Sequence, residues 1–205
     1  DLRVVLLMSD GFEKNDAKEP TQAQVFELLG RLLYVCNVIE LRLRWMHKHC
    51  GGIWTGKTPE ELKTKLKKVL EKQQKDDKRM LGLVGQEMVD EIYTSCSDKD
   101  FVEAQKNGLA VVKIDYKIET EEGLRRATEL FKRFTDARNY LVHFFSRDYS
   151  LATLESCQNA YSDLKEKFVI IQEADTFFGT SYNMMIEAMR EAFLEIADLV
   201  KEKRS

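Results

Sequence analysis

The stretch QAQVFELLGRLLYVCNVIELRLRWMHKH, residues 22–49, decides the fold of this 205-residue chain. Its apolar side chains recur three and four positions apart, which is the spacing of one face of a helix. The members of this stripe are Val25, Leu28, Leu29, Leu32, Leu33, Cys36, Ile39, Leu43 and Met46. Thr21 is placed to cap the first turn, and Gly51 and Gly52 end the pattern. The stretch therefore predicts a single long amphipathic helix.

The C-terminal half of the chain repeats this helical spacing in three stripes, within residues 127–145, 154–171 and 182–200. The short run FFSRDYS, residues 144–150, separates the first stripe from the second. Helices of this kind bury their apolar faces against one another. We therefore expect a mainly α protein, an up-and-down bundle formed by the first helix and the C-terminal helices.

Residues 50–119 read as a mixed α/β insertion within a single domain that spans residues 1–205. Thr58, Pro59 and Glu61 are the capping signature of a lysine-rich helix that we expect on the surface, and shorter helices are expected at 86–95 and 98–106. LAVVKIDYKIE, residues 109–119, alternates apolar and polar side chains and predicts a strand. A lone strand needs a partner, for which the N-terminal RVVLLM or a second copy of the chain is expected.

The amino-acid composition limits the classes of protein to which this chain can belong. Hydrophobic residues make up 43% and charged residues 33% of the chain, and the net charge of −3 predicts no general affinity for nucleic acid. The four cysteines, which form no CxxC pair, indicate reduced thiols and a cytoplasmic location. No apolar run reaches the roughly 18 residues that a membrane helix needs, and the N-terminal run has the wrong flanks for a signal peptide.

Two motifs match known site patterns in spacing but not in context. GGIWTGKT, residues 51–58, satisfies the spacing of a phosphate-binding loop, yet it follows a helix, and Pro59 removes one of the N–H donors that such a loop uses. HKHC places His47 and His49 about 200° apart around a helix, so their rings diverge from any shared metal. Neither motif predicts a cofactor or metal site.

RNYLVH, residues 138–143, combines an arginine, an asparagine and a histidine on one predicted helix. If residues 122–146 form one straight helix, Asn139 and His143 share the face opposite the apolar stripe. Arg138 then lies beside the stripe with its guanidinium reaching outward, and Arg147 follows His143 by one turn. We expect His143 to point away from the core.

These side chains suit cleavage of an RNA phosphodiester without a metal. Imidazole moves protons near neutral pH, and a guanidinium stabilises negative charge on the phosphate. Asparagine can orient either group. One copy of these residues offers few groups to act as general acid, general base and charge stabiliser at once. In a dimer, two copies could divide these roles between them. An ordinary polar helix face is the alternative interpretation of the same residues.

The motif resembles the Arg-x4-6-His signature of the HEPN superfamily, and the helix, motif, break and long helix of residues 120–204 are similar to the pattern of that family. The resemblance implies a HEPN-like bundle that dimerises and cleaves RNA without a cofactor, as toxins and anti-phage effectors do, with an antitoxin protein as a further partner. Arg138, Asn139 and His143 would be the catalytic residues, with Glu40 and Arg147 as accessory residues. Some relatives bind without catalysing, so a helical binding or regulatory module stays the alternative, and a nucleotide-binding protein using GGIWTGKT is a third.

Overall fold

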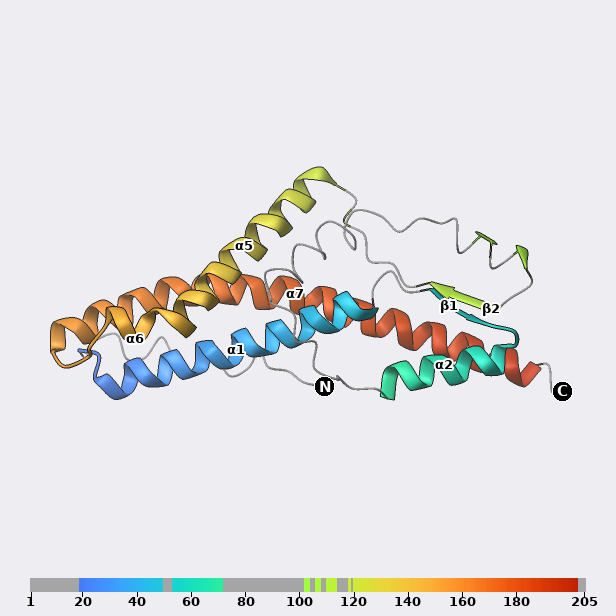
Figure 1. The fold of residues 1–205 in the computed structure, drawn as a ribbon, viewed down its shortest axis with the longest axis horizontal. Helices are drawn as coiled ribbons and strands as arrows, with labels where there is room; N and C mark the ends of the chain where they lie inside the picture. The colour runs from blue at the N-terminus through green and yellow to red at the C-terminus, as the bar shows by residue number, and fades with distance from the viewer. Residues whose placement is uncertain are drawn as a thin grey trace.

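The computed structural model describes residues 19–49, 53–71, 102–103, 106–107, 110–113, 118 and 120–202. They confirm a mainly α protein. Helix α1 spans Gln22–His49, α5 spans Glu121–His143, the short α6 spans Phe145–Asp148, and α7 spans Leu154–Glu202. Helix α1 lies along α7, whereas α5 packs on both at its C-terminal end and rises away from them toward its N-terminus (Figure 1).

The predicted first helix is confirmed, with the expected cap. The Gln24 N–H donates to Thr21 Oγ1 at 3.4 Å, and the Thr21 N–H donates to Gln24 Oε1 at 2.8 Å. This reciprocal pair satisfies two backbone donors that a helix N-terminus leaves without partners. Thr120 caps α5 in the same manner by accepting from the Gly123 N–H at 3.0 Å.

The division of the C-terminal region into separate helices is wrong, because residues 154–202 form one helix of 49 residues. At 1.5 Å per residue this helix is roughly 70 Å long. Gly179 lies within it without ending it. Its missing side chain instead leaves room for Arg42 of α1, whose Nη1 would lie 3.0 Å from a Cβ added at that position.

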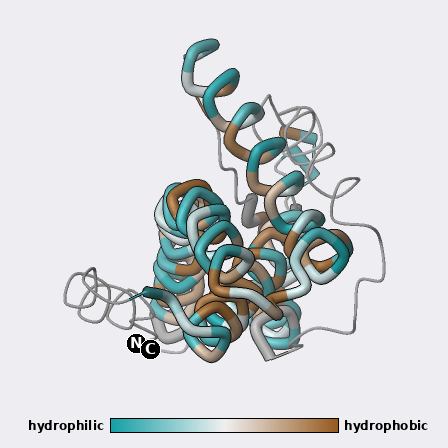
Figure 2. The backbone as a smooth tube through the Cα atoms, turned by 90° about the vertical axis from the view of Figure 1, so that its left-hand side faces the viewer, coloured by the Kyte–Doolittle hydropathy of each residue, from teal (hydrophilic) through white to brown (hydrophobic). Residues whose placement is uncertain are grey.

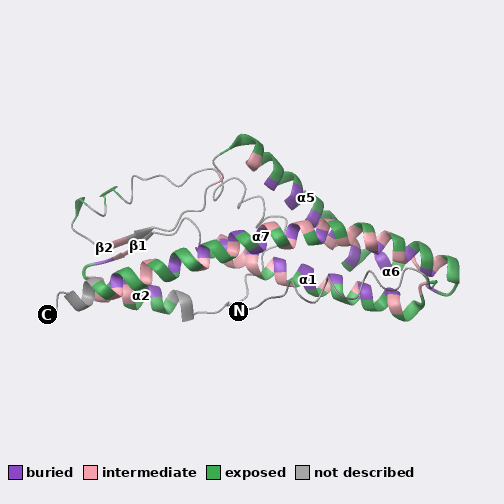
Figure 3. Cartoon of the chain, turned by 180° about the vertical axis from the view of Figure 1, so that it is seen from behind, coloured by how far each residue is buried: buried purple, intermediate pink, exposed green. Residues whose placement is uncertain are grey.

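The main core lies where α1, α5 and α7 face one another. In Figure 2 the tube shows apolar, brown residues on the sides where the helices face one another, and in Figure 3 buried residues recur along the same helices. The largest side chains that the core encloses include Phe134, Phe145, Phe178, Leu32, Ile39, Leu43 and Leu164. Burial of a side chain of this size stabilises the fold by about 1.5–3 kcal/mol. The predicted stripe of α1 is the face that this core buries.

A small sheet and helix α2 occupy the far end of α7. Strand β1 (Ile53–Gly56) pairs antiparallel with β2 (Ala110–Lys113), with Trp54 opposite Val112. The predicted strand is therefore present over residues 110–113, and its partner among the described residues is β1, which was not one of the partners expected. The RVVLLM segment lies outside the described residues, and the observed partner comes from GGIWTGKT, which folds back because Gly56 allows a close approach to Leu62 and Thr58.

Helix α2 (Pro59–Glu71) begins at the predicted cap, where the Glu61 N–H donates to Thr58 Oγ1 at 3.2 Å and the Lys57 N–H donates to Glu61 Oε2 at 3.0 Å. It exposes most of its lysines, yet Leu62 and Leu66 are buried against Ile196 of α7. The helix therefore packs through a narrow apolar edge. The short helix expected at 86–95 and most of the one expected at 98–106 lie outside the described residues.

Among the helices within the described residues, none has the length and apolar character needed to cross a membrane.

Candidate functional site

Arg138 lies at the contact between α5 and α1. Its Nη2 donates to Glu40 Oε2 of α1 at 3.2 Å, and its Nη1 donates to Asn139 Oδ1 at 3.2 Å. The side chain of Arg138 is 25% exposed and that of Glu40 is 15% exposed. The stem of Arg138 is thus packed while its head remains accessible, as the helix geometry predicts. Glu40, named from the sequence as an accessory residue, lies in direct contact with Arg138.

Glu40 joins two arginines. Its Oε1 accepts from Arg44 Nη2 at 2.6 Å and from Arg44 Nε at 3.3 Å, while Oε2 accepts from Arg138. Two guanidinium groups therefore converge on one carboxylate. Arg44 was not among the site residues expected from the sequence. Its spacing of four residues from Glu40 was a signal for an ion pair on one helix face, but only the structure shows that Arg138 shares the carboxylate.

Cys36 lies in the core beneath this cluster. Burial raises the pKa of its thiol to about 12, with the nearby Glu40 carboxylate acting in the same direction and Arg138 opposing it. A thiol with this pKa stays protonated near neutral pH and is a poor nucleophile. The thiol beneath the Arg138, Glu40 and Arg44 cluster is therefore uncharged.

His143 is the last residue of α5, and its side chain is exposed. The prediction that it points away from the core is confirmed. Its ring forms a T-shaped contact with the Phe144 ring, with 6.2 Å between ring centroids. Among the described residues no hydrogen bond or ion pair joins His143 to Arg138. The structure thus holds Arg138 against α1 and presents His143 to solvent five residues later on the same helix.

The helix does not run straight over residues 122–146, because the expected break at FFSRDYS, residues 144–150, begins directly after His143. Helix α5 ends at His143, and Phe144 is its C-cap, with its N–H donating to Tyr140 O at 2.9 Å. Arg147 therefore lies on α6 and not on the next turn of α5. Its Nε donates to Asp148 Oδ1 at 2.9 Å, and its guanidinium lies over the Phe144 ring, 4.8 Å from the centroid.

A polar network fixes the segment after α6 against α7. Lys167 of α7 pairs with Asp163 at 3.0 Å and lies over the Tyr140 ring, 5.2 Å from its centroid. Burial raises the pKa of Tyr140, and its interactions with Asp163 and Tyr149 add to that effect. Burial likewise raises the pKa of Tyr149, and the charge of Asp163 adds to the shift. The network ties both ends of the His143–Tyr149 region to one helix.

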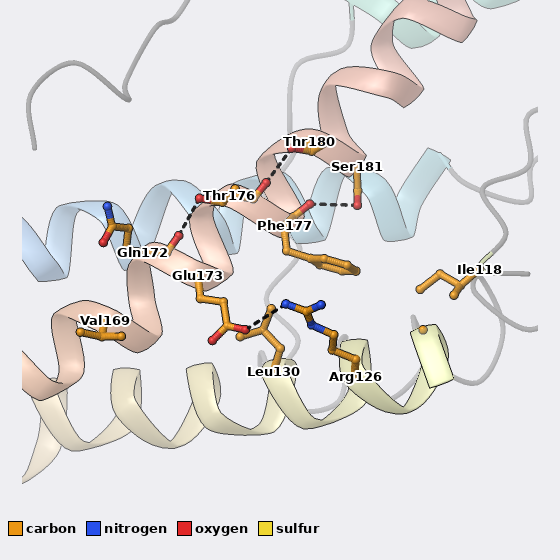
Figure 4. Close-up of a pocket in the computed structure, with 11 residues that line it drawn as sticks. Ile118, Arg126, Leu130, Val169, Gln172, Glu173, Thr176, Phe177, Thr180 and Ser181 are labelled. Atoms are coloured by element: carbon orange, nitrogen blue, oxygen red, sulfur yellow. Dashed lines mark hydrogen bonds and ion pairs between the residues drawn. The ribbon is translucent and has the colours of Figure 1, made fainter. Parts of the chain in front are cut away.

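A groove of about 980 Å³ opens between α5 and α7, where α5 rises away from the bundle (Figure 4). Leu130 and Phe177 form apolar lining, and Glu173 pairs across the groove with Arg126 at 3.8 Å. Neither Arg138 nor His143 lines it. The groove was not anticipated from the sequence, because it depends on the angle between two helices.

The structure also bears on the two rejected motifs. Residues 53–56 of GGIWTGKT are a strand and not a loop, and the Lys57 N–H is bonded to Glu61. His49 is buried beside Trp45, with 4.7 Å between their ring centroids, and burial lowers its pKa to about 4. A buried histidine of this kind serves packing. No group of three or more His, Cys, Asp and Glu side chains suited to a metal occurs within the described ranges.

Compared with models of protein families, with curated protein sequences and with solved structures, the chain matches none of them.

Proposed function

We propose that this protein is a metal-independent endoribonuclease of the HEPN type that acts as a homodimer in the cytoplasm. The observation that carries the proposal is the arrangement of Arg138 and His143. A partly buried ion pair holds Arg138 at the contact of two helices, while the imidazole of His143 is exposed at the end of the same helix. One helix thus offers a fixed cation and an accessible proton carrier.

In the proposed reaction the 2′-oxygen of a ribose attacks the adjacent phosphorus, and the bond from phosphorus to the 5′-oxygen breaks. His143 accepts the proton of the 2′-hydroxyl or delivers one to the leaving oxygen. Arg138 stabilises the negative charge on the phosphate, Asn139 and Glu40 position its guanidinium, and Arg147 is a further cation near His143. The products are a 2′,3′-cyclic phosphate and a 5′-hydroxyl. A second copy would provide the other proton carrier.

The experiment is an RNA cleavage assay in EDTA with the wild type and the variants His143→Ala and Arg138→Ala. Loss of a general acid or base lowers the rate by about a hundredfold or more. Arg125→Ala is the matched control, because Arg125 is an exposed arginine of the same helix that pairs only with Glu129 among the described residues. Cleavage by His143→Ala at the wild-type rate, with circular dichroism unchanged, would reject the proposal.

We place the nuclease among toxins and anti-phage effectors that an antitoxin protein neutralises. The expected result is growth arrest when the wild type is expressed, with normal growth for His143→Ala at the same protein level. Growth arrest by both would assign the toxicity to something other than RNA cleavage.

The second candidate function is a helical binding module without catalysis. It is favoured by an uncharged outer row on α1, where Phe26, Tyr34 and Leu41 are 54%, 58% and 40% exposed. Their spacings of eight and seven residues place them on one helix face, opposite the core. Tyr34→Glu should then change the mass measured by analytical ultracentrifugation. A wild type that self-associates through this row and leaves RNA intact would favour the module over the nuclease.

A further inference from the structure

Phe144 is an aromatic side chain that the fold turns outward beside the proposed reaction centre. It is 41% exposed, whereas its neighbour Phe145 is buried in the core. The two phenylalanines stand at the junction of two helices, where Phe144 is the C-cap of α5 and Phe145 is the first residue of α6.

The backbone of Phe144 is held on both sides. Its N–H donates to Tyr140 O at 2.9 Å, and its carbonyl accepts from the N–H groups of Arg147 and Asp148, each at 3.0 Å. An exposed ring on a backbone with three hydrogen bonds loses little freedom when a ligand packs on it. The ring is therefore prepared for contact and does not need a further folding step.

The groups around the ring suit an unpaired nucleotide. The Arg147 guanidinium lies 4.8 Å from the ring centroid, and the His143 and Phe144 rings form a T-shaped contact with an interplanar angle of 71°. Apart from this ring contact, the ion pair of Arg147 among the described residues is an exposed one with its neighbour Asp148, at 2.9 Å. Exposed pairs of this kind contribute little, so the guanidinium can turn to a phosphate at small energetic expense. Bases of single-stranded RNA stack on such rings, whereas duplex bases are inaccessible to them.

We propose that Phe144 is a stacking platform for an unpaired base of single-stranded RNA, with Arg147 contacting the adjoining phosphate. The inference rests on the proposed function, since it places the base next to the phosphodiester that His143 would act on. It adds the substrate class, which is unpaired rather than double-stranded RNA. It also assigns Arg147 to binding of the substrate.

The test measures binding of RNA whose 2′-hydroxyls are methylated, because this ligand lacks the attacking oxygen and stays intact. The wild type, Phe144→Ala, Phe144→Leu and Phe144→Trp are compared on a single strand and on the same strand in a duplex. Phe144→Ala and Phe144→Leu should weaken single-strand binding roughly tenfold, while Phe144→Trp retains it. Leu194→Ala is the control, because Leu194 is a 56% exposed apolar side chain on α7 that belongs neither to the Phe144 site nor to the outer row on α1.

The outcomes separate this inference from the nuclease. Cleavage by the wild type with equal single-strand binding and equal KM for Phe144→Ala would overturn the platform and leave the nuclease standing. Single-strand binding that depends on Phe144, by a wild type that does not cleave RNA, would support the stacking platform and reject the nuclease. Phe144→Leu binding as tightly as the wild type would show apolar contact in place of stacking. A molecular mass for Phe144→Ala that is half that of the wild type would assign Phe144 to a dimer interface. Either this result or wild-type binding by Phe144→Leu would overturn the stacking platform.

Discussion

The carboxylate of Glu40 and the guanidinium of Arg138 lie 3.2 Å apart although 98 residues separate them in the chain. Each side chain is mostly shielded from solvent, so removing one partner leaves a charge that water solvates poorly. The pair joins the N-terminal helix to the helix that carries the proposed catalytic residues.

Glu40→Gln should therefore lower the free energy of unfolding by about 1–3 kcal/mol. The measurement is urea unfolding followed by circular dichroism. Glu27→Gln is the matched control on the same helix, because Glu27 forms an exposed pair with Arg31 at the same spacing of four residues that separates Glu40 from Arg44. We expect less than about 0.5 kcal/mol there. A double-mutant cycle of Glu40→Gln with Arg138→Gln that returns no coupling would contradict a direct interaction.

Gly30 and Gly179 are both helical glycines, but their surroundings differ. A Cβ at Gly30 meets nothing within 4 Å, whereas one at Gly179 lies 3.0 Å from Arg42 Nη1, which pairs with Asp175 at 2.6 Å. Gly30→Ala should stabilise the protein by about 0.5–1 kcal/mol, the usual gain in a helix interior. Gly179→Ala should show no such gain, since the methyl group displaces the Arg42 guanidinium.

The comparison is made by thermal and urea unfolding. In a chain that already carries Arg42→Ala, Gly179→Ala should recover the stabilisation seen at Gly30. If Gly179→Ala is as stabilising as Gly30→Ala with Arg42 intact, the close approach has no energetic effect.

The buried His49 predicts a loss of stability in mild acid. Burial lowers its pKa to about 4 from a model-compound value of 6.5, so the unfolded chain binds a proton at this site over a pH range in which the folded chain does not. The contribution is complete above about pH 6.5 and is lost as the pH falls toward about 4. Between about pH 7.5 and pH 5 the expected decrease is about 2 kcal/mol.

His49→Gln removes the titrating group and should reduce that decrease by about the same amount. The measurement is the urea midpoint and slope at the two pH values for both chains. An equal decrease in wild type and variant would show that other groups cause the acid sensitivity.

Cys36 should be inert in the folded protein. With a pKa of about 12 its thiolate is scarce near neutral pH, and its side chain is buried. In a variant whose only cysteine is Cys36, we expect a thiol-reactive dye to label slowly in buffer and rapidly in urea. Fast labelling in buffer, with the far-UV spectrum unchanged, would mean that the Glu40–Arg138 contact opens readily.

Local patterns predicted much of this structure because local physics determines them. The stripe of α1, the caps at Thr21 and Thr58, and the outward direction of His143 depend on spacing within one helix, and all are observed. Glu40 was named from its place in an apolar stretch, and its contact with Arg138 required the packing of two helices. The catalytic roles of these residues stay predictions.

The features that the sequence reading missed depend on distant segments. The partner of β2 comes from a stretch whose glycines suggested a helix stop, and the close approach of Arg42 to Gly179 joins two helices that are far apart in the sequence. Arg147 does not lie on the helix that carries His143, because α5 ends at His143 and α6 begins two residues later at Phe145, which the core buries. Short-range periodicity carries no information about such contacts.

The length of α7 has a consequence for how the protein opens. Its first part buries side chains such as Leu164 and Phe178 with α1 and α5, whereas its far end buries Ile196 with Leu62 and Leu66 of α2, and among the described residues the two apolar clusters have no member in common. Segments without shared buried contacts exchange their amide protons as separate cooperative units. The amides of α2 and of the last turns of α7 should therefore exchange with deuterium together, at a rate well above that of the amides near Phe178. The α2 end of the protein would then unfold locally while the main core of α1, α5 and α7 stays folded.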